Sequence, residues 1–319
     1  MDKLTQKIRQ EAARLLADHQ VDRVIGFQEG TLPLRSAPVI VHDPADVDKL
    51  VWNSFCGNNL ARYLRGLGGR RVAIVAKGCD VRSIIALIVE KQFSRDQVVI
   101  IGVPCQRMID WRKVAKAVNG EILRAEERDG ELLVESKGFK RSLQRDDFIH
   151  SLCAACTHRN PIVYDILVGE PVEEAGQTPF PESAAFEERS PAERWAFYKD
   201  EMSRCIRCYG CREACPMCYC EECFVDHSQP SWIAKSVEPS AVQIWQIVRA
   251  YHQAGRCVSC GACERACPMN IKLLYLTEGL NDLAREMFDF ETGLNTESLP
   301  PFATFDPDAM RDTAKQDGR

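Results

Sequence analysis

The sequence lacks any long apolar segment. Its longest uninterrupted run of apolar residues, Ile84–Val89, is six residues long, whereas a membrane-spanning helix needs about 20. Residues 1–20 are charged and amphipathic, which is unlike the apolar core of a secretory signal. We therefore expect a soluble, cytoplasmic protein that does not insert into a membrane.

The chain also lacks an excess of positive charge and the common nucleotide-binding motifs. Its formal net charge is −5, so no basic surface for nucleic acid is expected. No Walker sequence is present, and the glycines of residues 66–69 precede a predicted strand instead of following one, which indicates a turn and not a dinucleotide fingerprint. Cys156 is followed by Thr157, so the attachment pattern of c-type haem is absent.

Cysteine, in contrast, is abundant. The 319 residues include 16 cysteines, and without a secretory signal this number favours metal ligation in a reducing compartment over disulfides. Eight of them form two copies of the pattern C-x2-C-x2-C-x3-C-P, whose positions are Cys205, Cys208, Cys211, Cys215 and Pro216, then Cys257, Cys260, Cys263, Cys267 and Pro268. This spacing is typical of bacterial [4Fe–4S] ligation and predicts two cubane clusters.

The fourth cysteine of each motif lies beyond the reach of the cube held by the first three. In two-cluster ferredoxins it ligates the other cluster. The predicted ligands are therefore Cys205, Cys208, Cys211 and Cys267 for cluster 1, and Cys257, Cys260, Cys263 and Cys215 for cluster 2. Zinc knuckles are the alternative, but zinc sites usually take two separated C-x2-C pairs.

The rest of the sequence predicts two structural regions. Strands alternate with helices in the first half, which indicates an α/β layer with a mostly parallel or mixed sheet. The expected strands are 24–27, 38–41, 72–76 and 98–103, the expected helices are 4–19, 46–65, 80–93 and 109–118, and residues 122–134 suggest a hairpin. The cysteine motifs lie among helices, expected at 191–204, 240–252 and 271–287, with no strands around them.

These patterns divide the chain into four parts. We expect an α/β domain with an iron–sulfur site at residues 1–169 and an acidic, proline-rich linker at 170–190. An α-helical ferredoxin domain should follow at 191–290, with a polar tail at 291–319. In the helix at 240–252 we interpret the apolar stripe from Val242 and Trp245 to Tyr251 as core.

Five further cysteines lie in the α/β half. Cys79 follows one predicted strand and Cys105 follows the next, and neighbouring parallel strands would bring both to the same carboxyl edge of the sheet. Cys153 and Cys156 form a C-x2-C pair that could complete a shell of four thiolates. A lone cysteine is usually a small buried apolar residue, but this placement favours a third cluster.

These elements resemble a known family. The segments 77–80, 102–105 and 153–156, followed by Tyr164-Asp165-Ile166 and Gly169, are similar to the beta subunits of coenzyme F420 (deazaflavin) hydrogenases and dehydrogenases, over about residues 20–170. The family branch associated with formate dehydrogenase and heterodisulfide reductase is the most similar. The helical part resembles the ferredoxins of heterodisulfide reductase and succinate dehydrogenase. The resemblance implies a [4Fe–4S] cluster on Cys79, Cys105, Cys153 and Cys156, beside an FAD that exchanges electrons with a deazaflavin.

The sequence differs from this family in the segment that supports flavin binding. A paired-glycine segment that supports flavin binding in the family corresponds here to Gly57-Asn58-Asn59-Leu60. FAD therefore stays open. Lys77 and Arg82 flank a helix start that could hold a flavin phosphate, although two solvated cations are the simpler interpretation.

Four of the 16 cysteines are not assigned to the three predicted clusters, and together they would make a fourth set of four. They are Cys56, Cys218, Cys220 and Cys223. We treat them as a possible fourth cluster; spectators, alternative ligands or a zinc site are the other interpretations.

The leading functional hypothesis is an electron-transfer subunit of an anaerobic oxidoreductase complex. Expected partners are a heterodisulfide-reductase-like flavoprotein, a hydrogenase, a formate dehydrogenase or a chain of the methylenetetrahydrofolate reductase type, and no nucleic acid. The alternative is a flavoenzyme that itself oxidises or reduces a deazaflavin or nicotinamide, and a third possibility is a zinc-stabilised scaffold.

Overall fold

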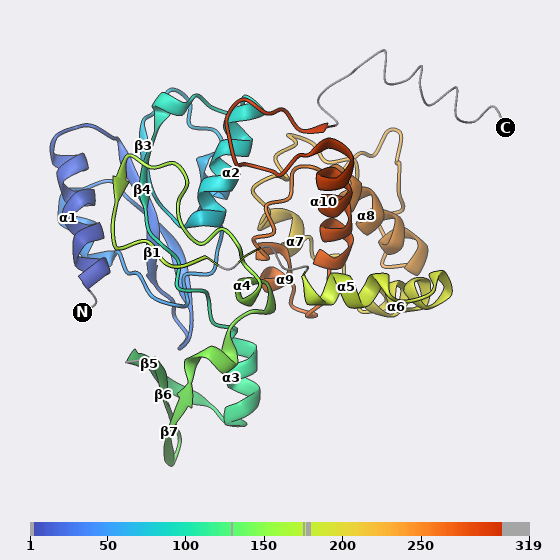
Figure 1. Cartoon of the computed structure of the whole chain (residues 1–319), viewed down its shortest axis with the longest axis horizontal. Coiled ribbons are helices and arrows are strands. Elements are labelled where there is room, and N and C mark those ends of the chain that lie inside the picture. Colours follow the sequence, from blue (N-terminus) through green and yellow to red (C-terminus); the bar gives the residue numbers. More distant parts are fainter. Residues whose placement is uncertain (1–2, 129, 175, 177–179, 302–319) are drawn as a thin grey trace.

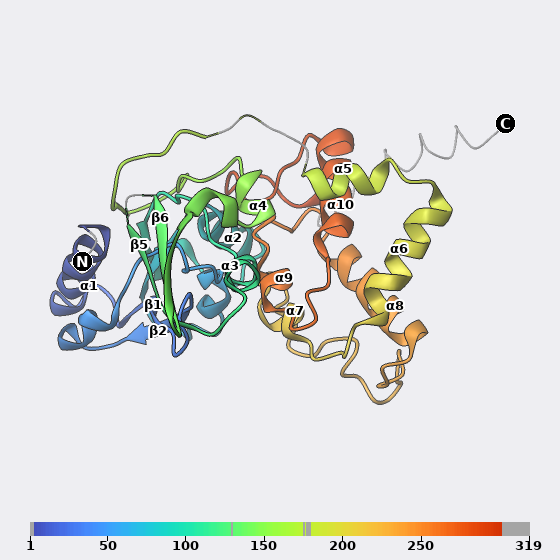
Figure 2. The same ribbon diagram turned by 90° about the horizontal axis from the view of Figure 1, so that it is seen from below.

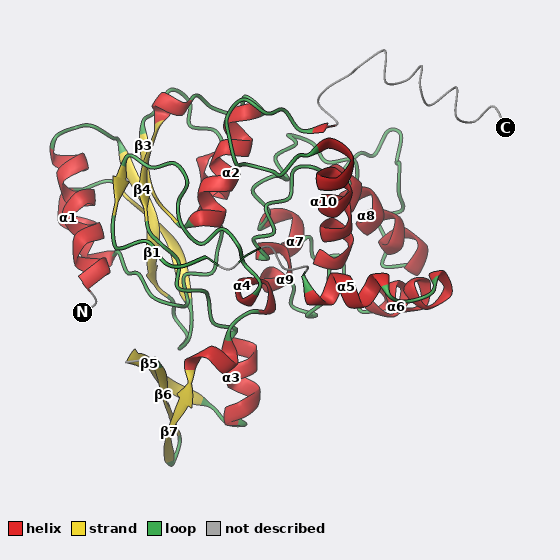
Figure 3. Cartoon of the chain, in the orientation of Figure 1, coloured by secondary structure: helices red, strands yellow, loops and turns green. Residues whose placement is uncertain are grey.

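The computed structural model describes residues 3–128, 130–174, 176 and 180–301. An α/β region and a helical region lie side by side, with the N-terminal helix and α6 at opposite ends of the molecule (Figure 1). Figure 3 shows the strands confined to the α/β side, as the sequence predicts. Among the described residues, no helix combines the length and the apolarity needed to cross a bilayer.

The main sheet has five strands in the order β2-β1-β3-β4-β8. Their bounds are β1 Arg23–Glu29, β2 Ser36–Val41, β3 Val72–Ala76, β4 Val98–Gly102 and β8 Ile166–Leu167. Only β2 runs antiparallel to its neighbour, β1, and the other pairs are parallel. The predicted α/β fold with a mixed, mostly parallel sheet is therefore confirmed.

Two helices cover the sheet from opposite sides, α1 (Lys3–Ala17) and α2 (Gly78–Val89) (Figures 1 and 2). All ten residues of β3 and β4 are buried between them, which explains their uninterrupted apolar sequences. The parallel register sets Ala76 opposite Gly102. The loops that follow both strands consequently leave the sheet at one edge.

A second, smaller sheet projects from this region (Figure 1). Its antiparallel strands are β5 Ile122–Arg128, β6 Glu131–Ser136 and β7 Phe139–Gln144, and α3 (Trp111–Val118) precedes it. The expected hairpin is thus extended by a third strand. Val114, Leu132 and Val134 form its own small buried core.

The expected helix over 46–65 is wrong. The structure has two short 3₁₀ turns instead, Pro44–Lys49 and Leu60–Leu64. Between them the Asn53 side chain accepts a hydrogen bond from the backbone N–H of Phe55 at 2.9 Å. Such a side chain gives the backbone an alternative to the helical hydrogen bonds, and it holds this segment as a loop.

The helical region contains six helices within the described residues. They are α5 Pro181–Glu187, α6 Pro191–Ser203, α7 Gly210–Glu213, α8 Pro239–His252, α9 Ala262–Ala266 and α10 Leu274–Phe288. Ser190 and Glu193 form a capping box with Pro191 at the first turn, which fixes the start of α6. The expected helices at 191–204, 240–252 and 271–287 correspond to α6, α8 and α10.

Two segments differ from their expected character. Helix α5 lies inside residues 170–190, for which we expected an extended linker. In the expected polar tail, Thr292 is buried, and its carbonyl accepts two hydrogen bonds from Arg82, at 3.0 and 2.8 Å. This contact ties the start of the tail to α2. Residues 302–319 of that tail lie outside the described residues.

A buried ion pair fixes the junction between β3 and α2. The Lys77 ammonium lies 2.9 Å from the Asp80 carboxylate, and their side chains are only 2% and 0% exposed. Asp80 also accepts hydrogen bonds from the backbone N–H groups of Lys77 and Leu60. Burial opposes the charge on Lys77, but the neighbouring Asp80 outweighs it and raises the pKa of Lys77.

We expect the variant Lys77→Met to unfold more easily by about 3–5 kcal/mol, because it leaves the Asp80 carboxylate buried without its counter-ion. The matched control is Lys49→Met, since Lys49 also pairs with an aspartate three residues away, Asp46, but both side chains are about half exposed. Its effect should stay within about 0.5 kcal/mol. Urea midpoints measured under anaerobic conditions compare the two variants, and equal losses would contradict the role of burial.

Candidate iron–sulfur centres

The two ferredoxin-type motifs have the same local backbone. Each motif contains a one-turn helix, α7 in the first and α9 in the second. The residues before and after the second cysteine are left-handed in both copies: Arg207 and Tyr209 in the first, Ser259 and Gly261 in the second. Left-handed geometry costs a non-glycine residue about 1–2 kcal/mol. Its repetition at matching positions indicates that both loops are shaped for the same purpose.

The loops pack directly against each other through α7 and α9. A side chain added at Gly210 would come within 3.1 Å of the carbonyl oxygen of Ala266. This close approach brings cysteines of the two motifs together. Cys211 lies within electrostatic reach of Cys205 and Cys267. Cys257, Cys260 and Cys263 all lie within reach of Cys215.

Burial dominates the chemistry of these thiols. It raises the pKa of Cys257 to about 12, with Glu278 and Cys260 adding to the effect. Burial also raises the pKa of Cys260 and that of Cys263. Burial therefore favours the protonated form of these three thiols of the second motif. A cationic iron core would have to displace these protons to be ligated, which couples its binding to the release of protons.

Helix α8 directs a row of polar side chains at the cysteines. Gln246, Arg249 and Gln253 are each at least 96% buried, and their spacing of three and four residues places them on one face. The Gln246 amide lies 4.0 and 3.9 Å from the sulfurs of Cys205 and Cys211. We call these three side chains the α8 polar row.

Arg249 is the charged member of this row. Burial opposes its charge, but Cys263 and Cys211 outweigh burial and raise its pKa. Its guanidinium also donates to the carbonyl oxygen of Cys211 at 3.3 Å, whereas its Nε has no hydrogen-bond partner. Arg249 therefore places a permanent positive charge beside thiols from both motifs.

The sequence interpretation of α8 missed this row. We interpreted the helix by its apolar stripe, but Tyr251 at the end of the stripe is 62% exposed. The signal that could have found the row is a set of polar residues at helical spacing that faces the same side as Val242 and Trp245, both buried.

The α/β half gathers its own cysteines at the edge of the sheet. Cys79 is the second residue of α2, after β3, and Cys105 follows β4. Cys153 lies in α4 (Ser151–Ala154), and Cys156 lies just beyond it. The backbone N–H of Cys105 donates to the carbonyl of Arg159 at 3.0 Å and joins the two loops. All four cysteines line one cavity. Burial raises the pKa of Cys105 to about 12, with Cys153 adding to the effect.

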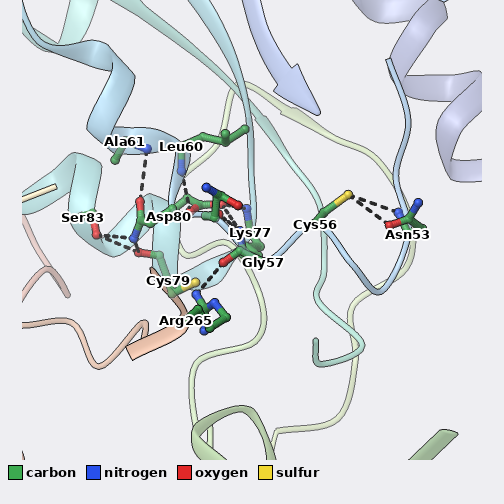
Figure 4. Close-up of polar contacts among 12 residues, drawn as sticks. Asn53, Cys56, Gly57, Leu60, Ala61, Lys77, Cys79, Asp80, Ser83 and Arg265 are labelled. Atoms are coloured by element: carbon green, nitrogen blue, oxygen red, sulfur yellow. Dashed lines mark hydrogen bonds and ion pairs between the residues drawn. The ribbon is translucent and has the colours of Figure 1, made fainter. Parts of the chain in front are cut away.

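This cavity also contains a cysteine from the ferredoxin-type region. Cys260 lines it together with the four thiols of the α/β half, and Cys79 lies within electrostatic reach of Cys260. Arg265, from α9, donates to the carbonyl of Gly57 (Figure 4). The two halves of the chain thus meet at their cysteines.

The leftover cysteines do not form one set. Cys218, Cys220 and Cys223 line a common cavity, but Cys56 is completely buried in the α/β core. Its thiol points toward Asn53 and away from Cys79 (Figure 4), at 3.5 Å from the Asn53 amide oxygen. Burial raises the pKa of Cys56 to about 11. The expected grouping of Cys56 with the other three is therefore corrected, and Cys56 is a small core residue.

Lys77 and Arg82, the two cations proposed to bind a flavin phosphate, are both paired with carboxylates of the chain. Lys77 is paired with Asp80, and its ammonium also donates to the carbonyl of Asn58 at 2.7 Å. Arg82 is paired with Glu291 at 2.9 Å. These two residues do not fit the phosphate of FAD, so the expected contact is corrected. A separate cavity beside Gly57 is lined by Arg35, among other residues.

The thiols are not arranged around a single metal ion. Within the described part of the chain, no three His, Cys, Asp or Glu side chains converge on the position of one ion. Zinc would draw its sulfur ligands to about 2.3 Å from one point, whereas a cubane holds its thiolates at the corners of a larger body. The donor set of soft thiolates in fours and its spacing fit [4Fe–4S] clusters.

Comparisons with known proteins agree with this chemistry. A family model described as a 4Fe-4S dicluster domain matches residues 201–271, which contain both ferredoxin-type motifs. The chain therefore provides for at least two [4Fe–4S] clusters.

Two sequence relatives extend over most of the chain. The F420-dependent formate dehydrogenase subunit beta of Methanocaldococcus jannaschii is 25% identical over 353 aligned positions, covering 90% of this chain and 91% of that protein. The F420-dependent formate dehydrogenase 1 subunit beta of Methanococcus maripaludis is 23% identical, covering 88% of each. The family resemblance inferred from the sequence is thereby confirmed.

A solved structure is also similar in part. It is the xenon-derivatised F420-reducing [NiFe] hydrogenase complex from Methanosarcina barkeri, with a TM-score of 0.40 and 14% identity over 63% of this chain and 86% of that chain.

The crossed ligation predicts a specific pattern of iron loss. A variant with serine at Cys257, Cys260 and Cys263 lacks three ligands of one cluster. Adding Cys215→Ser should remove no further iron, because that residue belongs to the cluster already lost. Adding Cys267→Ser should remove about four more irons per chain. Iron and sulfide analysis of the two quadruple variants, which share the triple substitution, checks this pattern. If Cys215→Ser removed the additional iron and Cys267→Ser did not, the crossed ligation would be refuted.

Proposed function

From the premise that this chain is a relative of the beta subunits of F420-dependent formate dehydrogenases and contains a 4Fe–4S dicluster domain, we propose that it is an electron-transfer subunit of such an oxidoreductase complex. It would relay single electrons between a flavin or other redox partner and a catalytic subunit. The partner would be a formate dehydrogenase, a hydrogenase, a heterodisulfide-reductase-like flavoprotein or a chain of the methylenetetrahydrofolate reductase type.

The observation that carries the proposal is the shared cavity between the two halves. The thiols of Cys79, Cys105, Cys153 and Cys156 surround the same space that Cys260 enters from the second ferredoxin-type motif. Each set of four thiolates would supply a [4Fe–4S] cluster that stores one electron. Electrons would then pass between neighbouring sets, from the α/β site to the second motif and from there to the first motif.

The chain's own residues would set the conditions for this transfer. Arg249 lies beside Cys211 and Cys263, and its positive charge favours the more negative, reduced form of the neighbouring clusters. The Gln246 amide aims at two sulfurs of the first motif. Burial of the Cys257, Cys260 and Cys263 thiols limits the access of water to the second set.

An exit for electrons is offered by the first motif. Cys208 is exposed, in contrast to the buried Cys211 and Cys267 of the same set. The neighbouring Ile206 is 53% exposed. An exposed apolar side chain beside a predicted cluster ligand fits the docking of a partner subunit, since apolar contacts exclude water from the path of the electron.

The alternative is a flavoenzyme that itself reacts with a deazaflavin or a nicotinamide. The cavity of about 260 Å³ beside Gly57 favours it, because this segment corresponds to the family's flavin segment. The orientation of Arg265 toward Gly57 disfavours it, since that side chain covers the glycine.

Anaerobically purified protein separates the two functions. The relay predicts acid-labile sulfide, several interacting paramagnetic clusters after reduction, no stoichiometric flavin, and co-purification with a catalytic oxidoreductase subunit. About one FAD per chain, together with reduction of F420 by the isolated chain, would support the flavoenzyme. Protein without sulfide would refute the relay.

The variant Cys105→Ser tests the third set. We expect it to lose about four irons per chain, while the paramagnetic signals of the two ferredoxin-type clusters remain, because Cys105 belongs to neither motif. Electron transfer between the two partners of the complex should fall at least tenfold. Full iron content in this variant would exclude Cys105 as a ligand.

A further inference from the structure

Three cysteines outside the predicted relay share a second cavity. Cys218, Cys220 and Cys223 line a space of about 410 Å³, at the end of α8. Cys220 is exposed and Cys218 is partly buried, so the cavity reaches the surface. They belong to one short segment that directly follows the first motif.

The same cavity is lined by charges of both signs, and the carboxylates of Glu213, Glu221 and Asp226 belong to it. Four arginines line it, namely Arg65, Arg212, Arg249 and Arg256. Arg212 is paired with Asp226 and Arg256 with Glu90. Among the described residues, neither Arg65 nor Arg249 has a carboxylate partner, and Arg249 is 96% buried with its Nε unpartnered.

Arg249 lies beside Cys218 as well as beside the motif thiols Cys211 and Cys263. Arg65 donates to the carbonyl oxygen of Cys218, so two cations approach the segment that carries the three thiols. We propose that Cys218, Cys220 and Cys223 hold a further [4Fe–4S] cluster through three thiolates, with the fourth iron facing the cavity. A cluster with three thiolates is an anion, which these two arginines would neutralise. A single zinc ion fits less well, because these thiols do not converge on one point and the cavity is far larger than one ion.

The site lies next to the second ferredoxin-type set. The Cys218 and Cys215 thiols contact each other, and the amide of Gln253 lies 3.4 Å from Cys218 and 3.5 Å from Cys215. A cluster here would exchange electrons with the cluster that Cys215 is proposed to ligate. It would form a branch to the surface at Cys220, separate from the exit at Cys208.

The test is metal and sulfide analysis of the full-length protein after anaerobic reconstitution. With the three relay clusters also filled, the wild type should contain about sixteen irons per chain. The double variant Cys220→Ser/Cys223→Ser should lose about four irons and four sulfides. Cys218 is kept in this variant, because replacing it would remove its contact with Cys215 and disturb the second set. The matched control is Cys56→Ala, which removes the remaining cysteine and should leave the iron content unchanged.

The paramagnetic signals of the other clusters, unchanged in the double variant, will show that it is folded. If it does not fold, Cys220→Ser alone replaces it, since that side chain is exposed. Wild-type protein with about twelve irons, or a double variant that keeps all its iron, would overturn the proposal. Loss of one zinc without sulfide would also overturn it. Each of these results leaves the proposed relay intact, because the relay depends on other cysteines.

Discussion

The burial of many sulfur ligands in one small volume is the constraint on which the rest of the structure depends. Thiolates and the clusters they hold carry negative charge, and buried charge must be compensated. The α8 polar row supplies this compensation from a single helix. Arg249 provides a full positive charge between the two motifs, and the Gln246 and Gln253 amides reach individual sulfurs. A helix that is polar on its buried face would be unstable in an ordinary core, but beside the clusters it is favourable.

The same constraint explains how the two halves are joined. Many of the polar contacts between them lie around the cysteines. Arg112 of α3 donates to the carbonyl of Cys267 at 2.8 Å, and Arg256 next to Cys257 forms two hydrogen bonds with Glu90 at the end of α2. Arg62 pairs with Glu213 of α7. These contacts fix the α/β edge against the ferredoxin-type loops, so that the cysteines of the two halves become neighbours.

Much of the fold could be predicted from sequence periodicity. Strands β3 and β4 were found because strands buried on both faces are apolar at every position. Prediction failed where a local side chain decided the backbone. Asn53 turns residues 46–65 into a loop, although their composition suits a helix. It is incomplete at α8, because the apolar stripe predicts only the burial of Val242 and Trp245, whereas Gln246 and Arg249 are buried as well.

The sequence by itself determined the kind of ligand and its number. The spacing of the eight motif cysteines is typical of cubane ligation, and the match to a 4Fe-4S dicluster domain agrees with it. Only the tertiary structure decided which other cysteines lie together. Cys56 and Cys220 are equally unassigned in the sequence, but one is enclosed by the apolar core and the other lies in an arginine-lined cavity. The physical reason is that ligation requires thiols to meet in space, and for residues far apart in the chain that depends on how the sheet edge and the helices pack.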